Sequence, residues 1–343
     1  MKKSLALLLA LAMVFSMCAC GNSGSTPAAT EAPAATEETP DAASLVSDAF
    51  IDPVNDWSQY NDLITAIKAE TDFAKRTEMM HEAEDILMSN YCVVPISYYN
   101  DIYLLKDYVE GMYANLFGTK FFQNVKMNNG SDTFRLNLAS EPDFLDPALN
   151  SSVDGACLAA ASFSGLYTDN AEGKTEPACA TGYEITEDGL NFTVTLKDGL
   201  KWSDGSDLTA KDFEYSFKRL ACPDTAAPYG ETVVGMIDGY KDAIGNPDAD
   251  GNTTTDPDWD ALNVHASEDG KTLTIQLSYP CSYFDKLCAF AAMSPVQQAT
   301  VEANGDAWCT QPDTFVCNGP YMITDWVPSE RIVLSKNPNY KGG

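Results

Sequence analysis

The chain has 343 residues, of which 45% are hydrophobic, and its 21 basic and 50 acidic side chains give a formal net charge of −29 at pH 7. Such an excess of negative charge repels phosphate backbones and anionic headgroups, so it argues against nucleic acid as a partner. About 300 residues lie beyond the N-terminal region, which is enough for two lobes rather than a single core.

The first 20 residues have the layout of a bacterial secretion signal. Two lysines precede an apolar run over residues 5–15, which is too short to span a bilayer permanently. The next residues, Met17-Cys18-Ala19-Cys20-Gly21, resemble the lipobox of bacterial lipoproteins. We therefore predict that residues 1–20 are a lipoprotein signal peptide and that Cys20, which follows the small Ala19, is lipidated. The alternative is an ordinary cleaved signal in which the cysteines are incidental.

Residues 21–43 consist mainly of Ser, Thr, Ala, Pro and Glu. A segment with so few large apolar side chains cannot bury enough surface to offset the entropy lost on ordering. We predict a disordered tether that holds the folded part away from the membrane surface. No later segment reaches the roughly 20 consecutive apolar residues that a membrane-spanning helix needs.

The folded part is predicted to begin with two helices, over residues 60–69 and 74–88. The second carries Met79, Met80, Ala83, Ile86 and Leu87 at spacings of three and four residues. Residues 92–99 then form a short apolar and aromatic run, which favours a buried strand, with Pro95 indicating an edge or a bend.

From about residue 131 the pattern is typical of a mixed α/β domain. Strands are expected over residues 134–138, 192–196, 272–277 and 331–334. Asp188-Gly189 is a strong turn signal, so residues 183–186 and 191–196 are predicted to pair as a hairpin. Thr209-Ala210-Lys211-Asp212 has the layout of a capping box and is expected to open a helix that buries Phe213, Phe217 and Leu220.

Motifs for catalysis and for metal binding are missing from the sequence. There is no Gly-x-Ser-x-Gly, no Gly-rich phosphate loop followed by Lys, and no His-Glu-x-x-His, and His81 and His265 are the only histidines. Eight cysteines follow the signal, but none form a CxxC pair, which disfavours zinc and leaves disulfide pairing open. We expect neither an enzyme nor a bound metal or cofactor.

The motifs from residue 131 onward, taken in order, resemble the oligopeptide- and dipeptide-binding proteins of ABC importers, the family 5 solute-binding proteins. Residues 141–147 read Glu-Pro-Asp-Phe-Leu-Asp-Pro, and residues 165–167 read Gly-Leu-Tyr. The most specific stretch is Lys201-Trp202-Ser203-Asp204-Gly205 with Leu208-Thr209-Ala210-Lys211-Asp212-Phe213. Asn318-Gly319-Pro320-Tyr321 and Asn337-Pro338-Asn339-Tyr340 complete the series.

Residues 60–122 resemble the same family, but its C-terminal end. The matching elements include Tyr60-Asn61-Asp62-Leu63-Ile64, Ala83-Glu84-Asp85-Ile86-Leu87 and Val109-Glu110-Gly111. We therefore divide the folded part into residues 44–128, which resemble the C-terminal part of the family, and residues 129–343, which resemble its N-terminal lobe. The resemblance implies a periplasmic-binding-protein-like fold of type II, with one mixed-sheet lobe and an incomplete second lobe.

The resemblance also implies where a ligand would bind. Ligand-facing positions fall at Asn150, Ser151, Ser152 and Val153, at Tyr229, at Tyr98 or Tyr99, and at Tyr340. The acidic residue that in many relatives holds a peptide's amino terminus would lie in the lobe that is absent here. Trp202, Asp204 and Gly205 are interpreted as structural.

The function implied by the resemblance is uptake of peptides as the extracytoplasmic, lipid-anchored receptor of an ABC importer at the cell membrane. Its partners would be a peptide, the permease subunits and the membrane through the lipid anchor, and the resemblance leaves room for a second polypeptide that supplies the missing lobe. A sensor or scaffold, an inactive remnant, and a receptor for nickel complexes, haem or sugars remain as alternatives.

Overall fold

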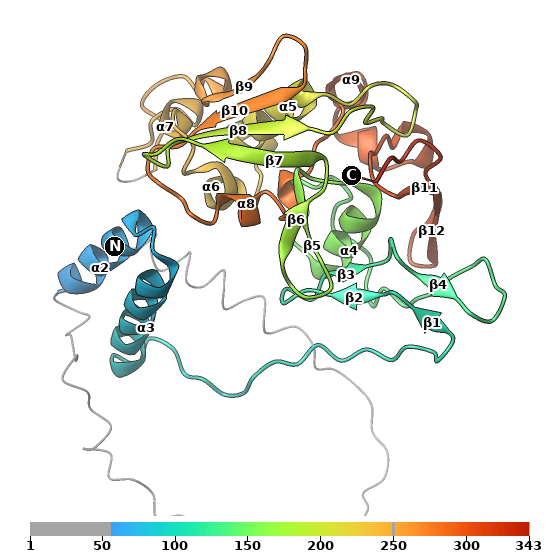
Figure 1. Ribbon diagram of the computed structural model, residues 1–343, viewed down its shortest axis with the longest axis horizontal. Helices are drawn as coiled ribbons and strands as arrows, with labels where there is room; N and C mark the ends of the chain where they lie inside the picture. Colours follow the sequence, from blue (N-terminus) through green and yellow to red (C-terminus); the bar gives the residue numbers. More distant parts are fainter. Residues whose placement is uncertain (1–55, 249–250, 343) are drawn as a thin grey trace, which may run out of the picture. The chain divides into compact units, whose positions relative to one another are not determined.

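The computed structural model describes residues 56–248 and 251–342 (Figure 1). The predicted signal peptide, tether and lipidated Cys20 lie outside the described residues. Within the described ranges, no helix is both long enough and apolar enough to cross a membrane.

Two helices begin the described part of the chain, which confirms the prediction for this region. α2 covers Ser58–Ala69 and α3 covers Phe73–Ser89. Asp72 caps α3, because its carboxylate accepts hydrogen bonds from the backbone N–H groups of Ala74 at 2.9 Å and Lys75 at 3.0 Å. In α3 only Ala83 and Ile86 are buried, so the apolar stripe predicted for this helix is only partly covered.

The buried strand predicted over residues 92–99 is wrong. This segment is extended but pairs with no strand of the described chain, and it is exposed along its length. Ile96 is 92% exposed and Tyr98 is 97% exposed. The apolar run gave the prediction, but a strand needs a neighbour for its backbone groups, and Pro95 removes one donor from the pairing.

Two short antiparallel pairs come next. β1 (Val109–Glu110) pairs with β4 (Lys126–Met127), and β2 (Tyr113–Ala114) pairs with β3 (Lys120–Phe121). These four strands form two small ladders in the part of Figure 1 next to α4 (Val153–Ser162).

The strand predicted over residues 134–138 is also wrong. The backbone turns at its end, because Ala139 has a φ of 74° and its N–H donates to Asn137 Oδ1 at 3.0 Å. Phe134 instead packs against Phe122, with ring centroids 5.9 Å apart.

A four-stranded antiparallel sheet forms the centre of the lobe, in the order β7-β8-β10-β9. β7 (Ala180–Ile185) and β8 (Asn191–Leu196) are the predicted hairpin, and Gly189 takes the φ of 71° that the turn requires. β10 (Thr272–Gln276) and β9 (Val264–Ala266) complete the sheet. The alternating residues Phe192, Val194 and Leu196 are buried, as a half-buried strand predicts.

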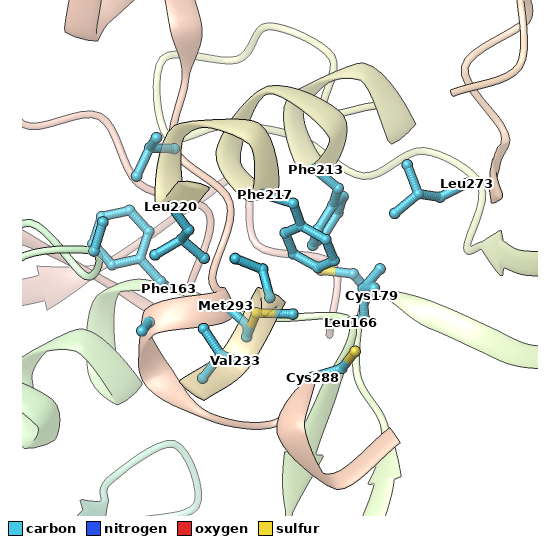
Figure 2. Packing of buried hydrophobic residues seen from close by; sticks show 14 of the residues in the cluster. Phe163, Leu166, Cys179, Phe213, Phe217, Leu220, Val233, Leu273, Cys288 and Met293 are labelled. Carbon is cyan, nitrogen blue, oxygen red and sulfur yellow. The ribbon is translucent and has the colours of Figure 1, made fainter. Parts of the chain in front are cut away.

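α5 (Ala210–Ala221) packs on β9 and β10. The capping box is present: the backbone N–H of Thr209 donates to Asp212 Oδ2 at 2.8 Å, and the Thr209 hydroxyl donates to the same oxygen at 3.2 Å. Phe213, Phe217 and Leu220 are buried and lie on the side of α5 that faces Val233 and Met293 (Figure 2). The predicted buried face of this helix is confirmed.

The remaining elements surround this core. A helix, α4, leads into the hairpin of β5 and β6, and the hairpin of β11 and β12, which contains the predicted strand over residues 331–334, closes the described chain. Their bounds, with those of the short helices and 3-10 turns, are α4 Val153–Ser162, β5 Tyr167–Asp169, β6 Thr175–Pro177, η2 Pro223–Thr225, α6 Gly230–Val234, α7 Tyr240–Ala243, η3 Trp259–Ala261, α8 Phe284–Leu287, η4 Ala291–Met293, α9 Gln298–Asn304, η5 Gly305–Cys309, η6 Pro312–Thr314, β11 Tyr321–Val327 and β12 Arg331–Lys336.

The eight cysteines between residues 92 and 317 are free thiols. Six of them are buried, and burial raises the pKa of Cys179 to about 11 and that of Cys317 to about 12. Such thiols are unreactive and serve as small core side chains.

Candidate functional site

A cavity of about 100 Å³ lies where the β2–β3 hairpin meets α4, β5 and the segment around η4. Its lining comes from several stretches that are far apart in sequence, namely residues 115–123, 156–169 and 286–294, together with Pro320 and Tyr340. Figure 1 shows β2 and β3 beside α4, and α4 contacts β3. Its lining residues are Asn115, Phe117, Thr119, Phe121, Gln123, Ala156, Ala160, Phe163, Ser164, Gly165, Tyr167, Thr168, Asp169, Lys286, Ala289, Phe290, Ala291, Ser294, Pro320 and Tyr340.

Aromatic rings form the apolar wall of this cavity. Phe290 is the central ring: Tyr229 packs edge-on against it with centroids 5.1 Å apart, and Phe117 does so at 6.3 Å. Phe117 is 69% exposed, so this wall reaches the surface. Flat apolar walls of this kind are common in sites for small ligands.

A polar network lies at another part of the lining. The Tyr113 hydroxyl donates to the backbone oxygen of Asp169 at 2.9 Å and accepts from Gln123 Nε2 at 2.7 Å. Asn115 Nδ2 donates to Asp169 Oδ2 at 3.2 Å. Burial raises the pKa of Tyr113 to about 12, so its hydroxyl keeps its proton throughout the physiological range.

The start of α4 is held by a carboxylate. Asp143 accepts from the backbone N–H of Ser151 at 3.1 Å, from the Ser151 hydroxyl at 2.8 Å and from the Ser152 hydroxyl at 2.7 Å. Burial alone would raise the pKa of Asp143, but the hydrogen bonds from Ser152 and Ser151 outweigh it and hold the pKa below its usual value. Ser152 is also the N-cap of α4, accepting from the Gly155 N–H at 3.1 Å.

A buried ion pair between Arg219 and Asp146 holds the loop that precedes α4. Arg219, on α5, contacts Asp146 with both terminal nitrogens, at 2.6 Å and 3.1 Å, and Trp308 Nε1 donates to the same carboxylate at 3.1 Å. The backbone oxygen of Asp146 accepts from the N–H of Asn150 at 3.0 Å. This bidentate geometry links the core to the loop that carries residues 150–153.

The structure brings some of the predicted ligand-facing residues together and leaves others apart. Tyr340 lines the cavity, and Tyr229 supports its aromatic wall. Asn150, Ser151 and Ser152 hold the start of α4 through the Asp143 network and do not line the cavity, whereas Val153 is 47% exposed beside Gly118.

Tyr98 and Tyr99 belong to the extended segment after α3 and are 97% and 78% exposed, away from the lining. Gln123, Asp169 and Phe290, which do line the cavity, were not predicted. Sequence alone offered no signal for them, because they lie in three separate segments and belong to no motif used for the resemblance.

Comparison with known proteins identifies the lobe. Residues 174–343 match the family described as bacterial extracellular solute-binding proteins, family 5, middle region. Residues 174–343 are thus similar to part of a family 5 solute-binding protein. The α/β periplasmic-binding-protein-like fold predicted from the sequence is thereby confirmed, for part of the family fold.

Curated proteins that are similar to this chain include two that are named for oligopeptides and one that is named for deoxycholate. The periplasmic oligopeptide-binding protein of Salmonella typhimurium is 39% identical over 205 residues, 60% of this chain and 36% of the relative. The oligopeptide-binding protein of Bacillus subtilis is 36% identical over 217 residues, 63% of this chain and 37% of the relative. A probable deoxycholate-binding periplasmic protein of Escherichia coli is 33% identical over 208 residues, 61% and 37% of the two chains.

Solved structures give the same result. The oligopeptide-binding protein of Haemophilus influenzae in complex with the peptide RPPGFSPFR has a TM-score of 0.54 at 30% identity, covering 60% of this chain and 38% of that one. The murein tripeptide-binding protein of Escherichia coli has a TM-score of 0.53 at 34% identity, covering 59% and 37%. The chain thus spans little more than a third of the length of the relatives it matches.

Proposed function

We propose that this chain is the solute-binding component of an ABC importer and that its ligands are peptides. Several matched relatives are named as oligopeptide-binding, and one structurally matched protein is described as the substrate-binding domain of an oligopeptide ABC transporter from Bacillus anthracis. The observation that carries the proposal is the cavity beside α4, because it joins an aromatic wall to a polar network in the family 5 lobe. The permease subunits of the importer would be its partners.

Ligand-dependent thermal stabilisation tests this proposal on the full-length chain purified in detergent. A ligand that binds only the folded state at about ten times its dissociation constant stabilises that state by about 1.4 kcal/mol, which raises Tm by a few degrees. We expect such a shift with a mixture of tripeptides and none with the constituent free amino acids. A shift with deoxycholate and none with peptides would contradict the peptide assignment, and the relative in Escherichia coli makes deoxycholate the appropriate competitor.

A lipid anchor at Cys20 is part of the same proposal. We infer from the lipobox resemblance that Cys20 carries the lipid and that the chain works at the extracytoplasmic face of the cell membrane. Cys20→Ser should move the protein from the membrane fraction into the soluble extracytoplasmic fraction, whereas Cys18→Ser should leave it in the membrane. Retention of the Cys20→Ser protein in the membrane would contradict the anchor assignment.

A second polypeptide is proposed to complete the receptor. The extended segment from residue 92 to residue 105 supports this, because Val94, Ile96, Tyr98, Ile102 and Leu104, which alternate along it, are all at least 75% exposed. The segment therefore presents apolar side chains that no other part of the described chain covers, and an uncovered apolar surface of this kind marks a site of contact with another chain. The occupant we propose is the part of the family 5 fold that the matched relatives have and this chain does not match.

A further inference from the structure

The turn between β2 and β3 carries Phe117, the ring of the aromatic wall that reaches the surface. One side chain holds this turn from inside: Asn115 Oδ1 accepts from the backbone N–H groups of Phe117 and Thr119, both at 3.1 Å. Gly118 follows with a φ of 81°, a left-handed conformation that residues with a side chain rarely adopt. The turn therefore has a defined shape, and the edge-on contact of Phe117 with Phe290 depends on what holds the turn in place.

Lys120, the first residue of β3, connects this turn to α4 and to the extended segment of residues 92–105. Its backbone N–H donates to Cys157 Sγ on α4 at 3.2 Å, which fixes its main chain on the lobe. Its ammonium group donates to the carbonyl oxygen of Gly118 at 2.9 Å and to Asp101 Oδ2 at 2.8 Å. One side chain thus contacts both the turn and the extended segment.

The ion pair between Lys120 and Asp101 is partly sheltered from solvent. The two side chains are 22% and 29% exposed, so water and salt screen the pair only in part. Burial lowers the pKa of Lys120, but the hydrogen bond and the charge of Asp101 outweigh burial and raise the pKa above its usual value. The ammonium group therefore keeps its charge and its contacts throughout the neutral range.

We propose that Lys120 is a positioning residue, which sets the Phe117 ring in the ligand wall through Gly118 and ties that position to the extended segment through Asp101. The inference rests on the proposed function, in which the wall contacts a peptide and the segment receives a second polypeptide. Lys120 does not line the cavity, so it acts on a ligand through its neighbours. Gly118 directly follows Phe117, so a turn that is released at Gly118 carries the ring away from Phe290.

Fluorine NMR measures the position of the ring without any ligand. We place para-fluorophenylalanine at position 117 of the full-length chain in detergent, and Phe290→Leu shows how much of the chemical shift comes from the Phe290 ring. Lys120→Met should move the resonance toward the value of the Phe290→Leu chain, because the turn loses its hold. Asp101→Asn should move it in the same direction by a smaller amount, since the ammonium group keeps its bond to Gly118.

Lys126→Met is the matched control, because it makes the same charge change at an exposed position of β4, outside the cavity lining. It should leave the resonance unchanged. A cooperative urea transition shows whether each variant is folded, and Asp101→Asn decides the question by itself if Lys120→Met does not fold.

A double-mutant cycle with Phe117→Ala measures the effect on binding. Calorimetry with trialanine should show that Lys120→Met weakens binding about threefold in the chain that has Phe117, an effect within the range of coupling between residues in contact. In the Phe117→Ala chain, Lys120→Met should have no measurable effect, because the ring through which Lys120 acts is gone.

The outcomes separate the inference from the proposed function. An unmoved resonance in the folded Lys120 and Asp101 variants, or equal weakening in both backgrounds of the cycle, would overturn the inference and leave the proposed function standing. No binding of trialanine by the unaltered chain would remove the proposed function and the ligand role of the wall, whereas the fluorine resonance would still decide whether Lys120 sets the ring.

Discussion

Asp146 and Arg219 illustrate how single residues set the position of the ligand-facing loop. The Asp146 side chain is 1% exposed and that of Arg219 is 12% exposed, so neither charge can be solvated if the other is removed. The same carboxylate also accepts from the Ala148 N–H at 2.9 Å. Asp146 therefore ties the core helix α5 to the loop that ends at Ser152.

Replacement of Asp146 by Asn should strongly destabilise the fold. The substitution would leave the buried Arg219 charge unpaired, which lowers the free energy of unfolding by about 3–5 kcal/mol. The loss should appear as a lower midpoint in a urea titration of the full-length chain. The matched control is Asp198→Asn, because Asp198 and Lys271 form an exposed ion pair and their separation should leave the midpoint nearly unchanged. A loss below about 1 kcal/mol for Asp146→Asn would contradict a structural role for the pair.

At the residue scale, the cavity contains some of the residues that were predicted to face a ligand and others that the sequence did not indicate, for a physical reason. Tyr340 and Tyr229 stand two residues and one residue, respectively, after a proline in motifs that the family resemblance locates; Tyr340 lines the cavity, and Tyr229 packs behind it on Phe290. Gln123 and Asp169 are linked through the Tyr113 hydroxyl, an arrangement that depends on the packing of the β2–β3 hairpin beside α4. No local pattern of charge or hydrophobicity predicts that these residues lie close together, because their proximity depends on tertiary contacts between distant segments.

Secondary-structure elements were predictable where local chemistry decides them. The β7–β8 hairpin depends on Asp188-Gly189, and α5 depends on a capping box and an apolar face, so both were located from the sequence. The run over residues 92–99 has the composition of a buried strand but no partner in the described chain. Strand formation is decided by a neighbour, which composition cannot reveal.

The cap of α5 gives a prediction at this scale. Thr209→Ala removes the hydroxyl that contacts Asp212 and should lower the free energy of unfolding by about 1 kcal/mol in a urea titration. Thr209→Ser keeps the hydroxyl and should retain most of that stability. If the Ala and Ser variants unfold at the same midpoint, the hydroxyl contributes nothing to the cap.

The exposed face of residues 92–105 predicts self-association of the purified chain. High net charge opposes association, so dimers and larger species should increase as added salt screens that charge. Ile96→Asp places a charge on the bare apolar face and should reduce the association seen by sedimentation velocity. Ser97→Asp adds the same charge at the neighbouring position without removing an apolar side chain, and should reduce the association less. Equal effects of the two variants would mean that net charge, and not this face, controls association.

The whole molecule sets the strength of binding. Pockets for small ligands are commonly about 300–1,000 Å³ and bury most of the ligand surface. The cavity beside α4 has about 100 Å³, so a bound peptide would leave most of its surface in water. The matched family members are much longer than the region they share with this chain, and the part that this chain does not match is available to them for enclosing a ligand.

We therefore expect the chain by itself to bind trialanine with a dissociation constant on the order of 1 mM, equivalent to about −4 kcal/mol. The polar network around Tyr113 and the aromatic wall supply the attraction, whereas an open cavity does little to offset the entropy lost when a flexible peptide is immobilised. Calorimetry of the full-length chain measures this value directly, and Phe290→Ala should weaken binding further because it removes the ring on which Phe117 and Tyr229 pack. Submicromolar binding by the monomer would contradict the prediction, because such affinity requires a ligand enclosed on more sides than this cavity provides.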